Sequence, residues 1–160
     1  MVTEYIHRLY KMTPKQLPNS TNSVVFVTPD PTSVSEVTQA LAQLDHDVIV
    51  VRDGYRAMNL TSIKPYNWKP SIFLVDLVIP NESGFVIAKH LLEKYNDGKV
   101  PVIIMTKHYS GEDAMEATQV GALGLLQKPV NLSDIKQLVE KEKARRAKSQ
   151  IAEMAFKINY

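Results

Sequence analysis

The stretch that decides the fold is residues 70–91, PSIFLVDLVIPNESGFVIAKHL. Its four apolar residues 72–75 run directly into Asp76, and apolar residues recur at helical spacing from Phe85 onward. A short uninterrupted apolar run is typical of a strand buried on both faces, and a recurrence every three or four residues predicts a helix with one apolar face. The stretch therefore predicts a buried strand, a turn and a helix.

The same unit recurs along the chain. Apolar runs at residues 24–27, 48–51, 102–105 and 122–126 predict four further strands, the last of them weak, and a helical pattern follows each run. Five short apolar strands that alternate with helices indicate a parallel sheet covered on both faces. Right-handed crossovers then predict an α/β fold with a doubly wound five-stranded parallel sheet, a (βα)5 sandwich.

The chain divides into three parts in this interpretation. Residues 1–22 form an N-terminal extension with linker chemistry, residues 23–145 form the α/β domain, and residues 146–160 form a C-terminal helical extension. A length of 160 residues suits one domain with short extensions. Because no second domain fits the remaining length, we expect any output to run through contact with another protein.

Composition excludes several classes of function. Nineteen basic and 17 acidic residues leave a net charge of +2, which gives no strong attraction to nucleic acid or membrane. The absence of cysteine excludes disulfides, thiolate metal sites and cysteine nucleophiles, and suits a reducing cytosol. No apolar run approaches the roughly 20 residues that span a bilayer, and the N-terminus lacks the apolar core of a signal peptide. We therefore expect a cytoplasmic protein with no nucleic-acid or membrane partner.

Three polar residues stand at the ends of predicted strands: Asp76, Thr106 and Lys128. Ligands of open parallel sheets bind at the carboxyl ends of the strands, so these side chains are expected in one crevice. A carboxylate is a nucleophile toward phosphorus, a hydroxyl can donate to a phosphoryl oxygen, and an ammonium offsets its charge. The three residues together predict a phosphoryl site.

The sequence resembles the receiver domain of bacterial response regulators over about residues 23–140. Residues 70–91, with Pro80 and Gly84, are similar to the family's segment around its phosphoacceptor. RDGYRAM, VPVIIMT and GALGLLQKPV resemble three further family motifs, in the right order and with separations of 30 (106 − 76) and 22 (128 − 106) residues between the strand-end residues. The resemblance implies a flavodoxin-like receiver fold and a role in two-component or phosphorelay signalling.

The resemblance also implies a role for each strand-end residue. Asp76 would accept a phosphoryl group from a histidine kinase or a phosphotransfer protein, Thr106 would bind that group and move, and Lys128 would pair with it. The backbone carbonyl of Val78 would be a metal ligand. The peptide bond before Pro129 is usually cis in this family.

The sequence departs from the family at its metal-binding acids. Thr28 and Pro29 stand where the family has an acidic pair, and Asp30 is the only acid beside them. Mg2+ binds through several oxygen ligands, usually including carboxylates, so Asp76 and the Val78 carbonyl are a poor cage. We therefore predict at most weak Mg2+ binding, no other cofactor, and weak or absent phosphorylation.

Four other residues of the predicted pocket either differ from the family or have an alternative role. Leu125 stands at the family's switch aromatic, and Lys107 follows Thr106 where a small residue is usual. Asp30 can be a metal ligand or the N-cap of the helix after it, and we favour the cap. Thr106 can also be a helix cap, and we favour the site.

Three functions are carried forward. The first is a receiver that acts by protein contact with a downstream target, with little or no phosphorylation and no enzymatic activity beyond self-phosphorylation or dephosphorylation at Asp76. The second is a catalytically competent stand-alone receiver or phosphorelay intermediate. The third is a flavodoxin-like small-molecule binder. The loops after the strands lack a phosphate-binding glycine cluster, which argues against this function.

The C-terminal extension carries an apolar stripe. Ile151, Met154, Ala155 and Ile158 recur on one helical face. This stripe can pack back on its own domain, or it can contact a partner or a second copy in a homodimer. The basic residues of 141–148 are interrupted by acids and indicate a solvated helix face rather than a nucleic-acid site.

Overall fold

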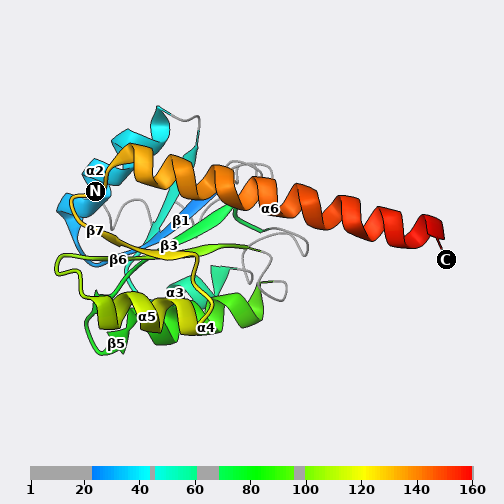
Figure 1. Cartoon of the computed structure of the whole chain (residues 1–160). Coiled ribbons are helices and arrows are strands. Elements are labelled where there is room, and N and C mark those ends of the chain that lie inside the picture. Colours follow the sequence, from blue (N-terminus) through cyan, green and yellow to red (C-terminus); the bar gives the residue numbers. More distant parts are fainter. Residues whose placement is uncertain (1–22, 44–45, 61–68, 96–99, 160) are drawn as a thin grey trace.

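A parallel five-stranded sheet forms the centre of the protein (Figure 1). The computed structural model describes residues 23–43, 46–60, 69–95 and 100–159, so the extension predicted for residues 1–22 lies outside the described part. The strand order is β2-β1-β3-β6-β7, and the predicted doubly wound α/β fold is confirmed. The strands are β1 (Ser23–Val27), β2 (Asp47–Val51), β3 (Ile72–Asp76), β6 (Val102–Thr106) and β7 (Gly124–Gln127).

Helices cover both faces of the sheet because each strand is apolar on both sides. Val25 and Val27 belong to the core cluster on one face, and Val24 and Phe26 to the cluster on the other. This alternation is why the strand is an uninterrupted apolar run in the sequence. One face is covered by α3 (Gly54–Met58), α4 (Gly84–Lys94) and α5 (Gly111–Gln119), and the other by α2 (Pro31–Ala42) and the first turns of α6 (Leu132–Asn159) (Figure 1).

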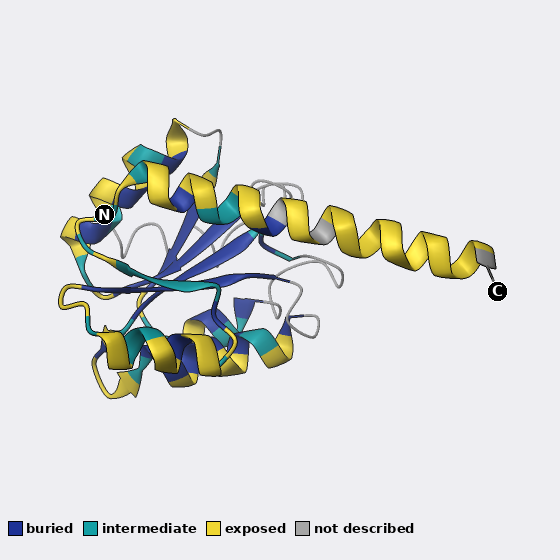
Figure 2. Cartoon of the chain, viewed as in Figure 1, coloured by how far each residue is buried: buried dark blue, intermediate teal, exposed yellow. Residues whose placement is uncertain are grey.

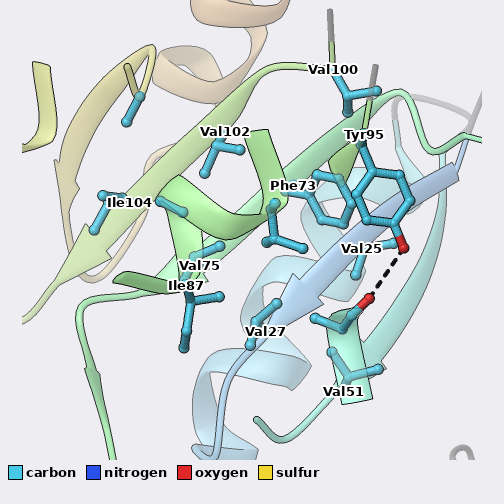
Figure 3. Packing of buried hydrophobic residues seen from close by; sticks show 14 of the residues in the cluster. Val25, Val27, Val51, Phe73, Val75, Ile87, Tyr95, Val100, Val102 and Ile104 are labelled. Carbon is cyan, nitrogen blue, oxygen red and sulfur yellow. Dashed lines mark hydrogen bonds between the residues drawn. The ribbon is translucent and has the colours of Figure 1, made fainter. Parts of the chain in front are cut away.

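Aromatic packing closes the core on the α3–α4 side. The rings of Phe73 and Tyr95 lie 4.9 Å apart between centroids, at an interplanar angle of 59° (Figure 3). The Tyr95 hydroxyl donates a hydrogen bond to the backbone oxygen of Ala57 at 3.2 Å, so the buried polar end of this side chain is satisfied. This contact ties the end of α4 to α3.

A small antiparallel ribbon, which the sequence did not predict, follows β3. It pairs β4 (Val78–Ile79) with β5 (Glu82–Ser83) around Asn81, whose φ of 64° lies in the left-handed region that asparagine tolerates. Glu82 Oε2 accepts a hydrogen bond from the Gly54 backbone nitrogen at 3.0 Å. The ribbon thereby joins the loop after Asp76 to the start of α3.

The last helix extends far beyond the sheet (Figures 1 and 2). Ile135 in its first turns is buried against the α2 side of the core, whereas Ile151 and Met154 are exposed. Of the two placements left open for the apolar stripe, packing back on the domain is therefore wrong. No helix in the described part of the chain is both long and apolar enough to cross a bilayer.

Gly84 permits the closest approach between α4 and β3. A Cβ atom at this position would lie 2.4 Å from the Asp76 backbone oxygen and 2.6 Å from the Leu77 Cα. The Gly84 nitrogen donates to the Leu77 oxygen at 2.8 Å, so the two backbones are held together here. Both obstructing atoms belong to the backbone that carries Asp76, and no side-chain rotation can relieve the overlap.

Gly84→Ala should therefore lower the free energy of unfolding by about 1–3 kcal/mol or more, because overpacking typically costs this much. Gly111→Ala is the matched control, because a Cβ there meets nothing within 4 Å at the start of α5. That substitution should be neutral or stabilise by less than about 1 kcal/mol. Urea denaturation of both variants makes the comparison, and equal stability of the two would contradict the close approach.

Candidate functional site

The centre of the candidate site is the carboxylate of Asp76, the last residue of β3, which is 3% exposed. Lys128 Nζ, just after β7, lies 2.7 Å from Asp76 Oδ1, and its side chain is only 10% exposed. On the other side, the hydroxyl of Thr28, just after β1, donates a short hydrogen bond to Asp76 Oδ2. Asp76 Oδ2 is therefore hydrogen-bonded, whereas the buried Oδ1 lies in an ion pair with Lys128 and receives no hydrogen bond from the described residues.

Lys128 reaches this position through the backbone after β7. Its nitrogen donates to the Thr106 oxygen at 2.7 Å, which continues the β6–β7 pairing by one residue. The peptide bond between Lys128 and Pro129 is cis, as the resemblance implied. The predicted convergence of Asp76 and Lys128 is present in the structure.

Thr106 ends β6 and is 5% exposed. Its hydroxyl accepts a hydrogen bond from the His108 nitrogen at 3.2 Å and donates to the His108 oxygen at 3.3 Å, so it turns toward its own loop. The N-cap of α5 is instead Ser110, whose hydroxyl accepts from the Asp113 nitrogen. Thr106 is therefore not a helix cap, and its role toward a phosphoryl group stays a prediction.

Asp30 is the N-cap of α2, as we favoured from the sequence. One carboxylate oxygen accepts from the Thr32 nitrogen at 3.1 Å and the other from the Ser33 hydroxyl at 2.9 Å. The hydrogen bond from Ser33 is the largest cause of a lowered Asp30 pKa. Lys107 Nζ lies 3.6 Å from the same carboxylate, in an exposed ion pair. Asp30 is therefore already committed to the start of its helix.

Thr28 has a function here that the sequence did not reveal. Besides donating to Asp76, its hydroxyl accepts a hydrogen bond from the Asp30 nitrogen at 3.1 Å, and its side chain is fully buried. From the sequence, position 28 is notable only because it lacks the acid that the family has there. The one available signal was a hydroxyl directly after a buried strand, and its partner became evident only when β1 and β3 were placed side by side. Neighbouring Pro29 is exposed.

The other two predicted positions differ in exposure. Leu125 in β7 is partly buried, lies opposite Ile104 and packs against the core cluster on the α4–α5 face. Val78 in β4 is 78% exposed. Within the described residues, no group of three or more histidine, cysteine, aspartate or glutamate side chains could hold a metal ion.

Comparison with known proteins identifies the response regulator receiver domain over residues 24–140. The chain belongs to this family. Receiver domains are signalling modules of two-component systems that interact with histidine kinases, are typically not enzymes, and typically bind Mg2+.

The relatives agree in length with the receiver portion. Protein PilH of Pseudomonas aeruginosa is 28% identical over 108 residues, which cover 68% of this chain and 86% of that protein. Response regulator Rcp1 of Synechocystis is 23% identical over an alignment that covers 73% of this chain and 84% of Rcp1. A crystal structure of Rcp1 in its Mn2+-bound form matches with a TM-score of 0.59 and 22% identity, and the match covers 75% of this chain and 90% of the Rcp1 chain. A receiver domain structure from Clostridium thermocellum gives a TM-score of 0.67 at 19% identity, over 78% of this chain and 96% of its own.

Burial raises the pKa of the Asp76 carboxyl above its ordinary value of 3.8. The Lys128 ammonium and the hydrogen bond from Thr28 offset part of this rise in the pKa, and the negative charge of Asp30 adds to it. The folded state thus holds this proton more tightly than the unfolded chain. The resulting stabilisation is complete below the unfolded pKa and is lost as pH rises through the folded pKa.

Thr28→Val should raise the Asp76 pKa further, because it removes a donor that stabilises the ionised form. At pH 7 the lost hydrogen bond should lower the free energy of unfolding by about 1.5–3 kcal/mol. An NMR titration of the Asp76 carboxyl carbon and urea denaturation measure the two effects. Thr28→Ser keeps the hydroxyl and should stay near the parent in both. A titration of Thr28→Val that coincides with the parent would show that the donor has no effect on the acid.

Proposed function

We propose that this receiver acts in two-component or phosphorelay signalling through contact with a downstream protein, with weak or absent Mg2+-dependent phosphorylation at Asp76. The observation that carries the proposal is the hydrogen bond that the Thr28 hydroxyl donates to Asp76 Oδ2. A nucleophilic carboxylate must present an oxygen to phosphorus, and Mg2+ must contact acidic oxygens nearby. In this pocket a hydroxyl hydrogen points at the Asp76 oxygen nearest β1.

The donor set does not fit a resident Mg2+ ion. Asp30 is occupied by its helix cap, Thr28 offers a hydroxyl in place of a carboxylate, and Pro29 has no polar side chain. What remains is one carboxylate and the Val78 backbone carbonyl. Mg2+ requires near-ideal octahedral coordination and gives up its waters reluctantly, so such a site binds weakly. Without metal, a phosphoryl transition state loses much of its charge stabilisation.

The other residues of the pocket fit a receiver that keeps the family's lysine but transmits its signal differently. Lys128 keeps the position from which an ammonium would offset phosphoryl charge. Leu125 has no polar edge to reorient at the switch position, and Lys107 places a further cation at the rim. A histidine kinase or phosphotransfer protein would remain a contact partner in the cytoplasm even where transfer is slow.

A competent receiver is the second candidate, and the Asp76–Lys128 contact favours it. It requires Asp30 to leave the cap of α2 and turn to the metal, at the cost of about 1 kcal/mol that a lost cap typically carries. A small-molecule binder of the flavodoxin type has no observation in its favour.

Calorimetry with Mg2+ and intact mass after incubation with acetyl phosphate separate the two candidates. The proposal expects no saturable Mg2+ binding at low millimolar concentration and little or no added phosphoryl mass. A clear sub-millimolar isotherm together with one phosphoryl group on the parent, lost in Asp76→Asn, would establish the competent receiver instead.

Restoring the acidic pair at positions 28 and 29 should restore Mg2+ binding. In Thr28→Asp with Pro29→Asp, two carboxylates join Asp76, and without metal they repel one another, most strongly between the buried positions 28 and 76. The variant should be less stable than the parent in chelator and recover on adding Mg2+, by about 2.7 kcal/mol at a hundredfold excess over Kd. It should also take up one phosphoryl group from acetyl phosphate, and Asp76→Asn should abolish that uptake.

The control for this repair is Thr28→Asn with Pro29→Asn, which makes the same backbone change without adding charge. Its melting temperature should not respond to Mg2+. A repaired variant that folds yet shows neither Mg2+-dependent stabilisation nor labelling would mean that Thr106 and Lys128 have also lost their inherited roles.

A further inference from the structure

The second half of α6 presents an apolar face that the described part of the domain does not cover. Ile151, Met154 and Ile158 are 66%, 63% and 80% exposed, on a helix that projects away from the sheet (Figure 2). The helix is continuous from Leu132 to Asn159, so the projecting part is held in line by the packed part. An exposed apolar stripe on a rigid helix is a contact surface.

The apolar positions of this segment have the spacing of a coiled coil. Five of them follow one another in steps of three, four, three and four residues, whereas Ala152, Ala155 and Phe156 lie off this line. This alternation keeps one narrow line of side chains facing a neighbouring helix, whereas a core-facing helix has a broader stripe. We call this line the seam, and it consists of Ala144, Ala147, Ile151, Met154 and Ile158.

The seam is flanked by positive charge. Residues 144–159 contain four basic residues, Arg145, Arg146, Lys148 and Lys157, and one acidic residue, Glu153, for a net charge of 4 − 1 = +3, although Arg145 is paired with Glu142 just before this range. The positions directly beside the seam hold Lys148, Gln150, Ala155 and Lys157, with no acid among them. Residues at these positions set the choice of partner in coiled coils.

We propose that the seam binds an amphipathic helix of a partner protein that carries acidic residues beside its own apolar stripe. This inference deepens the proposed function, because it names the surface through which the receiver's output contact is made. The apolar side chains supply the attraction, and opposite charges across the contact select the partner and its register.

A second copy of the chain fits this surface less well. Two identical segments, each with a charge of +3, repel one another in a parallel or an antiparallel pair, and neither brings an acid to Lys148 or Lys157. A membrane also fits less well. The line of the seam is bordered by the polar side chains of Lys148, Gln150 and Lys157, whereas a helix that lies on lipid has a broad apolar face.

The length of the seam predicts a reversible contact. From Ala144 to Ile158 it spans about 21 Å at about 1.5 Å per residue, which is two heptads. Its first two members are alanines, so the strongest attraction is confined to the outer part around Ile151. A contact of this size belongs with weak, transient interfaces rather than permanent ones.

The test uses the full chain and two synthetic helical peptides of about three heptads, both with isoleucine and leucine on the apolar stripe. One peptide has glutamate and the other lysine at the flanking positions. The chain should bind the glutamate peptide at least about tenfold more tightly in fluorescence anisotropy, and binding should weaken between about 0.05 M and about 0.5 M NaCl as the charges are screened. Ile151→Gln with Ile158→Gln should weaken it by at least about tenfold.

Ser149→Gln, at an exposed position off the seam, is the matched control and should bind like the parent. Melting temperatures should not differ among these variants, because all the changed side chains are exposed. Equal binding of both peptides, a stable dimer of the chain in sedimentation that excludes the peptides, or binding only to phosphatidylserine vesicles would each overturn the proposal. None of these outcomes involves Asp76, so Mg2+ binding and acetyl phosphate labelling test the pocket separately.

Discussion

The buried ion pair between Asp76 and Lys128 is the constraint on which the rest of the site depends. Removing a carboxylate and an ammonium from water is costly, and the cost is offset only when the two charges meet with good geometry. Here they lie 2.7 Å apart, with side chains 5% and 10% exposed. Loss of either partner would leave the other buried without its opposite charge, so the ends of β3 and β7 must keep their positions on the two sides of β6.

Thr28 completes this arrangement on the other side. Its hydroxyl donates to Asp76 and accepts from the Asp30 nitrogen, and the Asp30 side chain caps α2. One chain of hydrogen bonds thus links the end of β3, the central strand, to the start of α2. An acid at position 28 would need a cation between it and Asp76, whereas threonine satisfies the same carboxylate without one. Asp76 Oδ2 is therefore hydrogen-bonded within the pocket, whereas Oδ1 has the Lys128 ion pair and no hydrogen bond from the described residues.

The two halves of α6 show how one helix can serve packing and recognition. The first half buries Ile135 against the α2 side of the sheet, and the second half leaves the domain with its apolar line exposed. Glu142, 5% exposed, pairs with Arg145 at 2.6 Å near the point where the helix leaves the domain. A rigid projection of this kind places a recognition surface at a distance from the strand ends, where a partner can reach it without contacting the Asp76 pocket.

The sequence by itself determined the fold class and the positions of Asp76, Thr106 and Lys128 at strand ends, because uninterrupted apolar runs can be buried only in a sheet covered on both sides. It also identified Asp30 as a helix cap, since capping is local. Only the tertiary structure decided what Thr28 contacts, that Thr106 turns toward His108, and that a small ribbon follows Asp76. It also decided that the apolar stripe of α6 points into solvent. These features depend on which segments become neighbours in space. A periodic pattern in the sequence predicts which residues are buried, but it does not identify the residues that they contact.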